Sequence, residues 1–194
     1  MTKPVGVLGL QGDFREHLQA FDRLGISAVL VKRTTELSDV SGLVIPGGES
    51  TTIGKLARIF DIFEPIKTAV SEGLPVFGTC AGLILLADEI TDGIAGQETF
   101  GGLDVVVQRN AFGHQLDSFE VDLPFVGING NVHAAFIRAP LISSVGKLAT
   151  VVASLEDGRV VGVTQGNRLG ISFHPEVTGE DRIHSYFYDA LVRA

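Results

Sequence analysis

The single cysteine of this chain is the residue best suited to covalent catalysis. Cys80 lies between two glycines in Gly78-Thr79-Cys80-Ala81-Gly82, after an apolar run that predicts a strand over 75–78 and before one that predicts a helix over 81–89. A side chain on such a tight strand-to-helix turn is held ready to attack a substrate. The positive end of the helix favours the thiolate, which is the nucleophilic form. A free cysteine is often only a small buried apolar residue, but the flanking glycines favour a nucleophile here.

A nucleophilic thiol needs a base, and His174 is the histidine best placed to supply one. It follows an apolar strand predicted over 169–173 and opens the segment His174-Pro175-Glu176. Proline biases the preceding residue toward extended backbone, in which residues i and i+2 point to the same side. We therefore expect Glu176 to accept a hydrogen bond from one ring nitrogen and to leave the other facing the thiol. The alternative is a solvated turn. The remaining histidines have no such partner and are expected to be surface or structural residues: His17, His114, His133 and His184.

The loop after the third predicted strand is the third candidate part of the site. Pro46-Gly47-Gly48-Glu49-Ser50 follows the apolar run 42–45, and ligands of open α/β sheets bind beyond the carboxyl ends of strands. Successive glycines let backbone N–H groups point into a site. The N–H groups of Gly48 and Ala81 are therefore our candidates for an oxyanion hole. Alone, this segment is equally compatible with an ordinary turn and helix start.

The elements that would position these residues predict an α/β fold. The first half alternates short apolar strands with helical patterns, which predicts a largely parallel sheet with helices on both faces. The second half holds short strands without long helices between them, which predicts an antiparallel extension. We expect one domain over 1–194. The predicted strands are 5–10, 28–31, 42–45, 75–78, 105–107, 119–121, 134–137, 151–155, 160–164 and 169–173, and the predicted helices are 14–24, 50–60, 62–72, 81–89 and 179–192.

Composition argues against several classes of protein. A net charge of −8 without a basic cluster argues against binding to nucleic acid. No apolar run reaches the ~18 residues of a membrane span, and the beginning of the sequence lacks the features of a signal peptide, so we expect a cytoplasmic protein. One cysteine excludes an intrachain disulfide and a zinc site built on several thiolates. Neither a Rossmann fingerprint nor a phosphate loop is present, and we expect no cofactor and no metal.

Taken together, the three motifs resemble the class I, or triad, glutamine amidotransferases. Further segments narrow the resemblance to the glutaminase subunits of pyridoxal 5′-phosphate synthases, and they span nearly the whole chain. These segments are Leu8-Gly9-Leu10-Gln11-Gly12 with Arg15-Glu16-His17, Gly47–Thr52 (GGESTT), Phe77–Leu83 (FGTCAGL), Arg109–Gly113 (RNAFG), Phe136–Pro140 (FIRAP) and Ser172–Glu176 (SFHPE). The resemblance implies a flavodoxin-like fold.

The same resemblance implies an activity and a partner. The chain would hydrolyse L-glutamine to L-glutamate and ammonia, through a glutamyl thioester, and a separate synthase subunit would use the ammonia to build pyridoxal 5′-phosphate. Cys80, His174 and Glu176 match the catalytic triad. The glutamine-contacting positions match Gly48, Glu49, Ser50, Arg109, Ile137 and Arg138. Without the family, the two arginines would be assigned to solvation or a structural ion pair, although a guanidinium suits a substrate carboxylate.

Two departures and two alternatives accompany this assignment. His114 stands where the family is expected to have arginine, and the stretch 125–132 does not align. One alternative is a triad glutaminase that feeds another acceptor, and the other is a non-catalytic or redox-sensing protein with a reactive cysteine. The contact with a synthase would lie around Gln11 and 13–17, at the first strand–helix junction.

Overall fold

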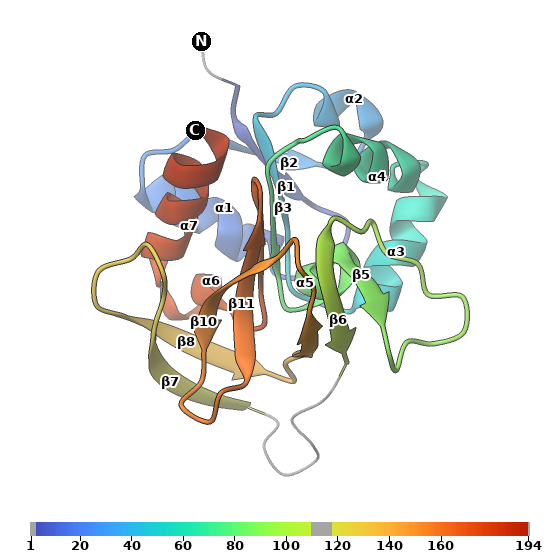
Figure 1. Cartoon of the computed structure of the whole chain (residues 1–194). Coiled ribbons are helices and arrows are strands. Elements are labelled where there is room, and N and C mark those ends of the chain that lie inside the picture. The colour runs from blue at the N-terminus through green and yellow to red at the C-terminus, as the bar shows by residue number, and fades with distance from the viewer. Residues whose placement is uncertain (1–2, 110–117, 194) are drawn as a thin grey trace.

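The computed structural model describes residues 3–109 and 118–193. Within these residues a ten-stranded sheet crosses the molecule in the order β2-β1-β3-β4-β12-β11-β9-β6-β5, with β10 paired to β11 (Figure 1). The first five strands of this order, β2, β1, β3, β4 and β12, are parallel to one another. Strands β11, β9 and β6 continue the sheet, each antiparallel to the strand before it. This confirms the predicted largely parallel sheet with an antiparallel extension. The strands are β1 (Val5–Leu8), β2 (Ala28–Val31), β3 (Gly42–Ile45), β4 (Val76–Thr79), β5 (Ala87–Ile90), β6 (Leu103–Gln108), β7 (Ser118–Pro124), β8 (Asn131–Ile137), β9 (Leu141–Val145), β10 (Thr150–Ser154), β11 (Val160–Gln165) and β12 (Arg168–Ile171).

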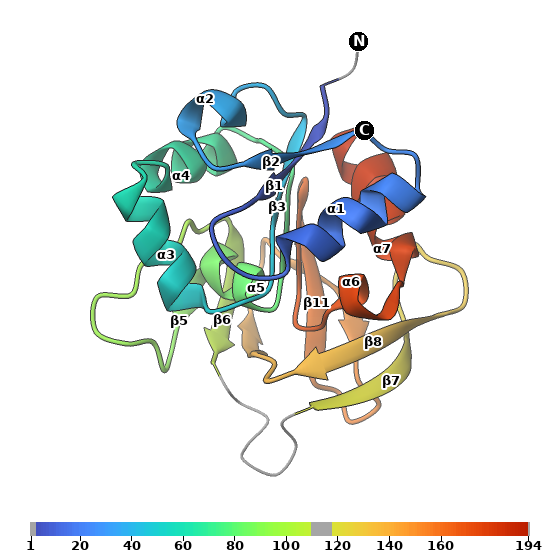
Figure 2. The ribbon, with the colours of Figure 1, turned by 180° about the vertical axis from the view of Figure 1, so that it is seen from behind.

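Helices cover both faces of the sheet, because its strands are apolar on both sides. Leu43 and Ile45 of β3 are buried on the face covered by α3, α4 and α5, whereas Val44 between them is buried on the face covered by α1 and α7. Figures 1 and 2 show these two groups of helices on opposite sides of the central strands. The helices are α1 (Phe14–Arg23), α2 (Thr34–Leu37), α3 (Ser50–Ile59), α4 (Phe63–Ser71), α5 (Ala81–Leu86), α6 (Pro175–Thr178) and α7 (Asp181–Phe187). None of the helices in the described residues is long and apolar enough to cross a membrane.

Several predicted elements differ from the structure where apolar residues allow two conformations. The helix predicted over 81–89 ends at Leu86, because Ala87 is extended and opens β5, which pairs with β6. A continuous apolar run does not distinguish a buried helix from a buried strand. Strand β9 and the short helix α2 were not predicted. Strands β7 and β8 were predicted as part of the main sheet, but they form a separate two-stranded sheet.

The C-terminal helix also departs from its predicted pattern. Ile183 and Phe187 are buried as predicted, but Ala190 is exposed and Leu191 only half-buried. Tyr188–Val192 forms a π-helical turn after α7. A π turn contains more residues than an α turn, and it rotates the residues that follow away from the apolar stripe.

Gly82 illustrates how closely the turn at Cys80 packs on the sheet. A Cβ at this position would collide with the carbonyl oxygen of Ile45 at the end of β3. We expect Gly82→Ala to lower the free energy of unfolding by about 1–3 kcal/mol, the usual cost of overpacking. Gly54→Ala in α3 is the matched control, because a Cβ there meets its nearest neighbour, Leu85, at an ordinary 4.0 Å. The control should gain about 0.5–1 kcal/mol. Urea unfolding measures both, and a Gly82→Ala protein as stable as the wild type would contradict the collision.

Candidate functional site

Three adjacent strands place the three sequence motifs at one edge of the sheet. β3, β4 and β12 are neighbours and parallel, so their carboxyl ends meet there. The loop 46–50 follows β3, Cys80 follows β4, and His174 follows β12 by a short link. A Cβ on Gly47 would collide with the His174 ring, so the glycine loop lies directly against the histidine. The fold therefore brings the predicted nucleophile, base and glycine loop together.

Cys80 has a backbone conformation that residues other than glycine rarely adopt. Its φ is 49° and its ψ is −100°, which costs of order 1–3 kcal/mol and occurs mainly at functional sites. Its N–H donates to the carbonyl oxygen of Ile171 in β12 at 2.9 Å, and α5 begins at the next residue. The N–H of Ala81 is the first of that helix and has no acceptor within it. The side chain of Cys80 is 7% exposed.

His174 and Glu176 form a buried hydrogen-bonded pair. His174 Nδ1 lies 2.7 Å from Glu176 Oε1, and the two residues are 4% and 5% exposed. The predicted contact is present, but the predicted extended backbone is wrong. Pro175–Thr178 forms the short helix α6 with His174 at its N-cap, because proline is well suited to the first position of a helix. Since Nδ1 bonds Glu176, Nε2 is the ring nitrogen left to face Cys80.

The charges of His174 and Glu176 each favour the ionised form of the other group. Burial alone would lower the pKa of His174, but its hydrogen bonds to Cys80 and Glu176 and the charges of these groups raise it to about 10. Burial raises the pKa of Glu176, and the hydrogen bond from His174 opposes that rise. An imidazolium next to Cys80 stabilises a thiolate and carries a proton that it can donate.

Asp13 extends this cluster from the start of α1. Its Oδ2 lies 3.5 Å from His174 Nδ1. Burial raises the pKa of Asp13, and the nearby His174 lowers it. Within residues 3–109 and 118–193, Asp13, His174 and Glu176 are the one group whose ligand atoms lie close enough together to hold a metal ion. A metal there would displace the His174–Glu176 hydrogen bond, so these residues fit a triad better than a metal site.

The predicted substrate residues on the other side of Cys80 are joined by polar contacts. Glu49 caps α3 by accepting a hydrogen bond from Thr51 N, and its Oε1 also lies 3.0 Å from Arg109 Nη2. Its own N–H donates to Gln11 Oε1 at 2.8 Å. Gly48 has a φ of +150°, and a Cβ there would meet the Gln11 side chain. These contacts place Gly48, Glu49 and Arg109 close together.

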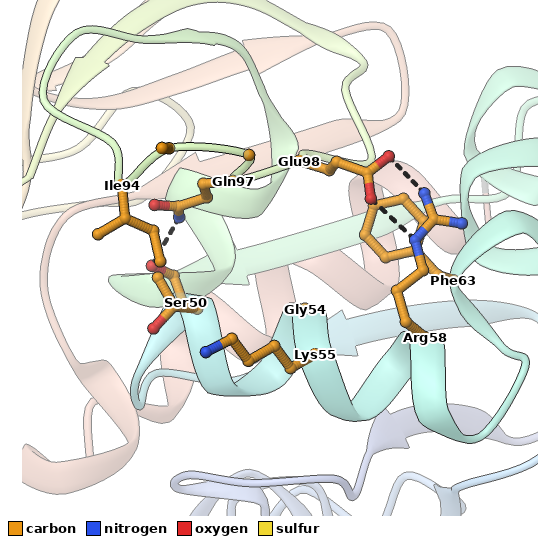
Figure 3. Close-up of a pocket in the computed structure, with 11 residues that line it drawn as sticks. Ser50, Gly54, Lys55, Arg58, Phe63, Ile94, Gln97 and Glu98 are labelled. Atoms are coloured by element: carbon orange, nitrogen blue, oxygen red, sulfur yellow. Dashed lines mark hydrogen bonds and ion pairs between the residues drawn. The ribbon is translucent and has the colours of Figure 1, made fainter.

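Sequence reasoning missed Gln97, which links two of the predicted residues. Its Nε2 donates to the hydroxyl of buried Ser50 at 3.1 Å, and its Oε1 accepts from Arg109 Nη1 at 3.0 Å. The loop that carries Gln97 faces α3 across a small pocket of ≈ 120 Å³ (Figure 3). Ser50 is the only predicted site residue that lines this pocket. No motif marked Gln97, because it lies in a turn-rich segment without periodicity.

Ile137 and Arg138 cover the site from the end of β8. The Ile137 carbonyl oxygen lies 3.9 Å from Cys80 Sγ, within the range of a weak sulfur hydrogen bond. Arg138 has a φ of 46° and an exposed side chain. The structure therefore brings the backbone of Ile137 to the thiol, whereas the Arg138 side chain is open to solvent. His114 and part of the segment Arg109–Gly113 lie outside the described residues.

Two histidines assigned by sequence to surface or structural roles lie next to the His174–Glu176 pair. His17 and His184 are both completely buried, and their ring nitrogens Nδ1 and Nε2 are 2.8 Å apart. His17 Nε2 also lies 3.7 Å from Glu176 Oε1. Their burial is compatible with the structural role expected for them, but the sequence did not show that they are partners, because α1 and α7 meet only in the folded chain. His133, in contrast, is a half-buried residue paired with Asp122 and Glu120.

Comparisons with known proteins identify the family of this chain. The model of the SNO glutamine amidotransferase family matches residues 7–193. A protein of Leifsonia xyli subsp. xyli, described as pyridoxal 5′-phosphate synthase subunit PdxT, is 59% identical over 184 residues, which cover 94% of this chain and 93% of the relative. A protein of the same description from a Nocardioides species is 54% identical over 191 residues, which cover 96% of this chain and 95% of that one.

Solved structures give the same result. A crystal structure described as glutamine amidotransferase superposes with a TM-score of 0.91 at 50% identity, covering 98% of this chain and 99% of the other. PurLQS from Thermotoga maritima, at 18% identity and a TM-score of 0.72 over 98% of this chain and 100% of the other, shares the fold. Family model, relatives and structure agree over almost the full length, and the chain belongs to the SNO glutamine amidotransferase family.

Proposed function

We propose that this chain is a cytoplasmic glutaminase that hydrolyses L-glutamine to L-glutamate and ammonia and delivers the ammonia to a synthase subunit that builds pyridoxal 5′-phosphate. One observation carries the proposal: Cys80 is held at a strained turn beside the buried His174–Glu176 pair, whose Nδ1–Oε1 distance is 2.7 Å. The names of the relatives support the partner, since PdxT is described as a subunit of a pyridoxal 5′-phosphate synthase.

Acylation of Cys80 would be the first half of the reaction. The thiolate attacks the carboxamide carbon of glutamine, and the backbone N–H groups of Gly48 and Ala81 stabilise the oxyanion. The carbon–nitrogen bond then breaks, and His174 gives its proton to the departing ammonia. A glutamyl thioester remains on Cys80.

Deacylation would use the same histidine in the opposite direction. His174, now neutral, takes a proton from water while the water attacks the thioester. The carbon–sulfur bond breaks, the thiolate and the imidazolium are restored, and the new carboxyl group loses its proton as glutamate leaves. Glu176 holds the imidazole in the required orientation during both halves. Glu49, Ser50 and Arg109, with the segment Ile137–Arg138, would hold the amino acid end of the substrate.

The test is glutamate release by the purified chain with and without its synthase subunit, combined with mass spectrometry of the intact chain after acid quenching. We expect faster release with the synthase and a mass gain of one glutamyl group at Cys80. Equal rates with and without the synthase would reject the proposed partner and favour another acceptor. A reactive Cys80 that forms no thioester would favour the redox-sensing alternative.

The raised pKa of His174 predicts the alkaline limit of this activity. Because the ring keeps its proton up to about pH 10, kcat of the complex at saturating glutamine should fall only as the pH rises through about 10, when the imidazolium is lost. In Glu176→Gln the negative charge that raises this pKa is gone, so the alkaline limb should move to lower pH. Exposed Glu156 is the matched control, and Glu156→Gln should leave the profile in place. The measurement is the rate of the wild type and both variants from about pH 6 to 11. An alkaline limb that stays in place in Glu176→Gln would contradict the pairing of Glu176 with His174.

A further inference from the structure

The buried pair His17–His184 lies directly behind the triad and has no part in the mechanism above. His17 is on α1 and His184 on α7, which pack side by side on the face of the sheet that also carries α6 (Figure 2). His17 Nε2 is 3.2 Å from the hydroxyl of Thr79, the residue before Cys80, and 3.7 Å from Glu176 Oε1. The pair therefore touches both the turn of the nucleophile and the carboxylate that orients the base.

Both rings are neutral near pH 7. Burial lowers the pKa of His17 well below its ordinary value, and the charges of His184 and His174 lower it further. Burial lowers the pKa of His184 to about 4, an effect that Asp181 opposes and Arg23 assists. A neutral imidazole has one N–H donor and one acceptor nitrogen, so the direction of the hydrogen bonds depends on the tautomers.

The surroundings favour one pair of tautomers. Among the described residues His184 Nδ1 is buried without a hydrogen-bond partner, and a buried N–H without an acceptor costs more than a buried lone pair. His184 therefore carries its proton on Nε2 and donates it to His17 Nδ1. His17 must then carry its proton on Nε2, where it points at the Thr79 hydroxyl and toward Glu176. The opposite arrangement would leave an orphan N–H on His184 and place a lone pair of His17 against the carboxylate.

The buried carboxylate of Glu176 has few hydrogen-bond donors among the described residues. Its Oε1 accepts from His174 Nδ1, whereas its Oε2 is buried without a partner in the part of the chain described here. We propose that His17 is a positioning residue: His184 fixes its tautomer, and the positive end of the N–H at Nε2, which is 3.7 Å from Glu176 Oε1, then favours the ionised carboxylate that orients His174. The catalytic part of this inference rests on the proposed function, because it assigns Glu176 to the triad.

Shape alone does not explain the histidine at position 17. The rings of His17 and Phe77 are packed edge to face with their centroids 6.1 Å apart. The His184 ring packs in the same way on Phe21 and Phe77, with centroid distances of 5.1 and 5.6 Å. A phenylalanine at position 17 would fill this aromatic surrounding but provides no N–H, whereas a glutamine provides a terminal amide that donates near Nε2. His17→Phe and His17→Gln therefore separate packing from the effect of the N–H group.

The first test compares these two variants in complex with the synthase subunit. We expect His17→Phe to lower kcat about tenfold with KM within about twofold, and His17→Gln to restore most of the rate. Among residues 3–109 and 118–193, the groups that act on Glu176 are His174 on its own segment and Asp13 and His17 on the α1 side. Thr79 and His184 contact His17. Without the donor at position 17 the ionised carboxylate loses stabilisation, so the acid limb of kcat/KM should move to higher pH in the Phe variant alone. Equal losses and unmoved limbs in both variants would show a packing role and overturn the proposal.

The second test does not depend on turnover. In the free full-length chain, ¹⁵N NMR of the histidine rings should give both His17 and His184 as Nε2–H tautomers, with signals assigned by their loss in His17→Gln and His184→Gln. A ¹³C titration should give a higher pKa for the Glu176 carboxyl in His17→Phe than in the wild type. A proton on His17 Nδ1, or an unchanged Glu176 pKa, would overturn the proposal. If the Phe variant does not fold, the tautomers of His17 and His184 in the wild-type chain test the proposal instead. A wild-type complex that released no glutamate would reject the proposed function, and these NMR results would still test the tautomer of His17 and its effect on the pKa of Glu176.

Discussion

Replacing Cys80 with alanine should lower glutamate release by more than about 10⁴-fold, because no thioester can form without the thiol. The side chain is small and is 7% exposed, so the loss of activity should come without loss of fold. The measurement is single-turnover glutamate release by the complex, together with the unfolding temperature of the variant. Residual release within about tenfold of the wild type would contradict the assignment of Cys80 as the nucleophile.

A glycine at the same position separates the chemistry from the backbone strain. Cys80→Gly should be as inactive as Cys80→Ala, but more stable than it by about 1–2 kcal/mol, because glycine adopts a φ of 49° without steric cost. Urea unfolding of the two variants gives the difference directly. Equal stabilities would mean that the turn at Cys80 stores no strain.

Replacing His174 with glutamine should lower kcat by about 100- to 10,000-fold, the range that a positioned acid–base group supplies. Glutamine can keep a hydrogen bond to Glu176 but cannot exchange a proton with the ammonia or the water. Since Glu176 is proposed to act only through His174, the double variant His174→Gln/Glu176→Gln should be no slower than the single His174 variant.

The double variant also provides the control on this assignment. If the two losses multiplied, Glu176 would act independently of His174, and the triad would have to be reconsidered. KM for glutamine should change little in either variant, since neither side chain is proposed to hold the amino acid end of the substrate.

The parts of the site that the sequence predicted are those that short local patterns determine. The strand-to-helix turn at Cys80 was predictable because a strand, two glycines and a helix lie within one short segment. His174 and Glu176 are two residues apart, and their contact follows even though the backbone between them is helical rather than extended. The parallel order of β3, β4 and β12 then requires that these motifs meet at one edge.

The parts that could not be predicted depend on contacts between distant segments. His17 and His184 are 167 positions apart, and only the packing of α1 on α7 makes them partners. Gln97 lies between Ser50 and Arg109 because of the path of its loop. A loop has no hydrophobic periodicity from which this position could be predicted. The end of α5 at Leu86 was missed because the apolar run continues into β5 without a change of composition.

The ion pair between Glu49 and Arg109 makes the proposed binding of glutamine an exchange reaction. The two side chains lie 3.0 Å apart, and Arg109 is only 13% exposed. An amino acid that binds to both side chains must separate them, with its ammonium group next to Glu49 and its carboxylate next to Arg109. A zwitterion replaces one ion pair by two and brings no net charge, so its affinity should depend little on ionic strength. A ligand with only one of these charges would leave the other side chain without a counter-ion, and this pair would thereby select amino acids before their side chains reach Cys80.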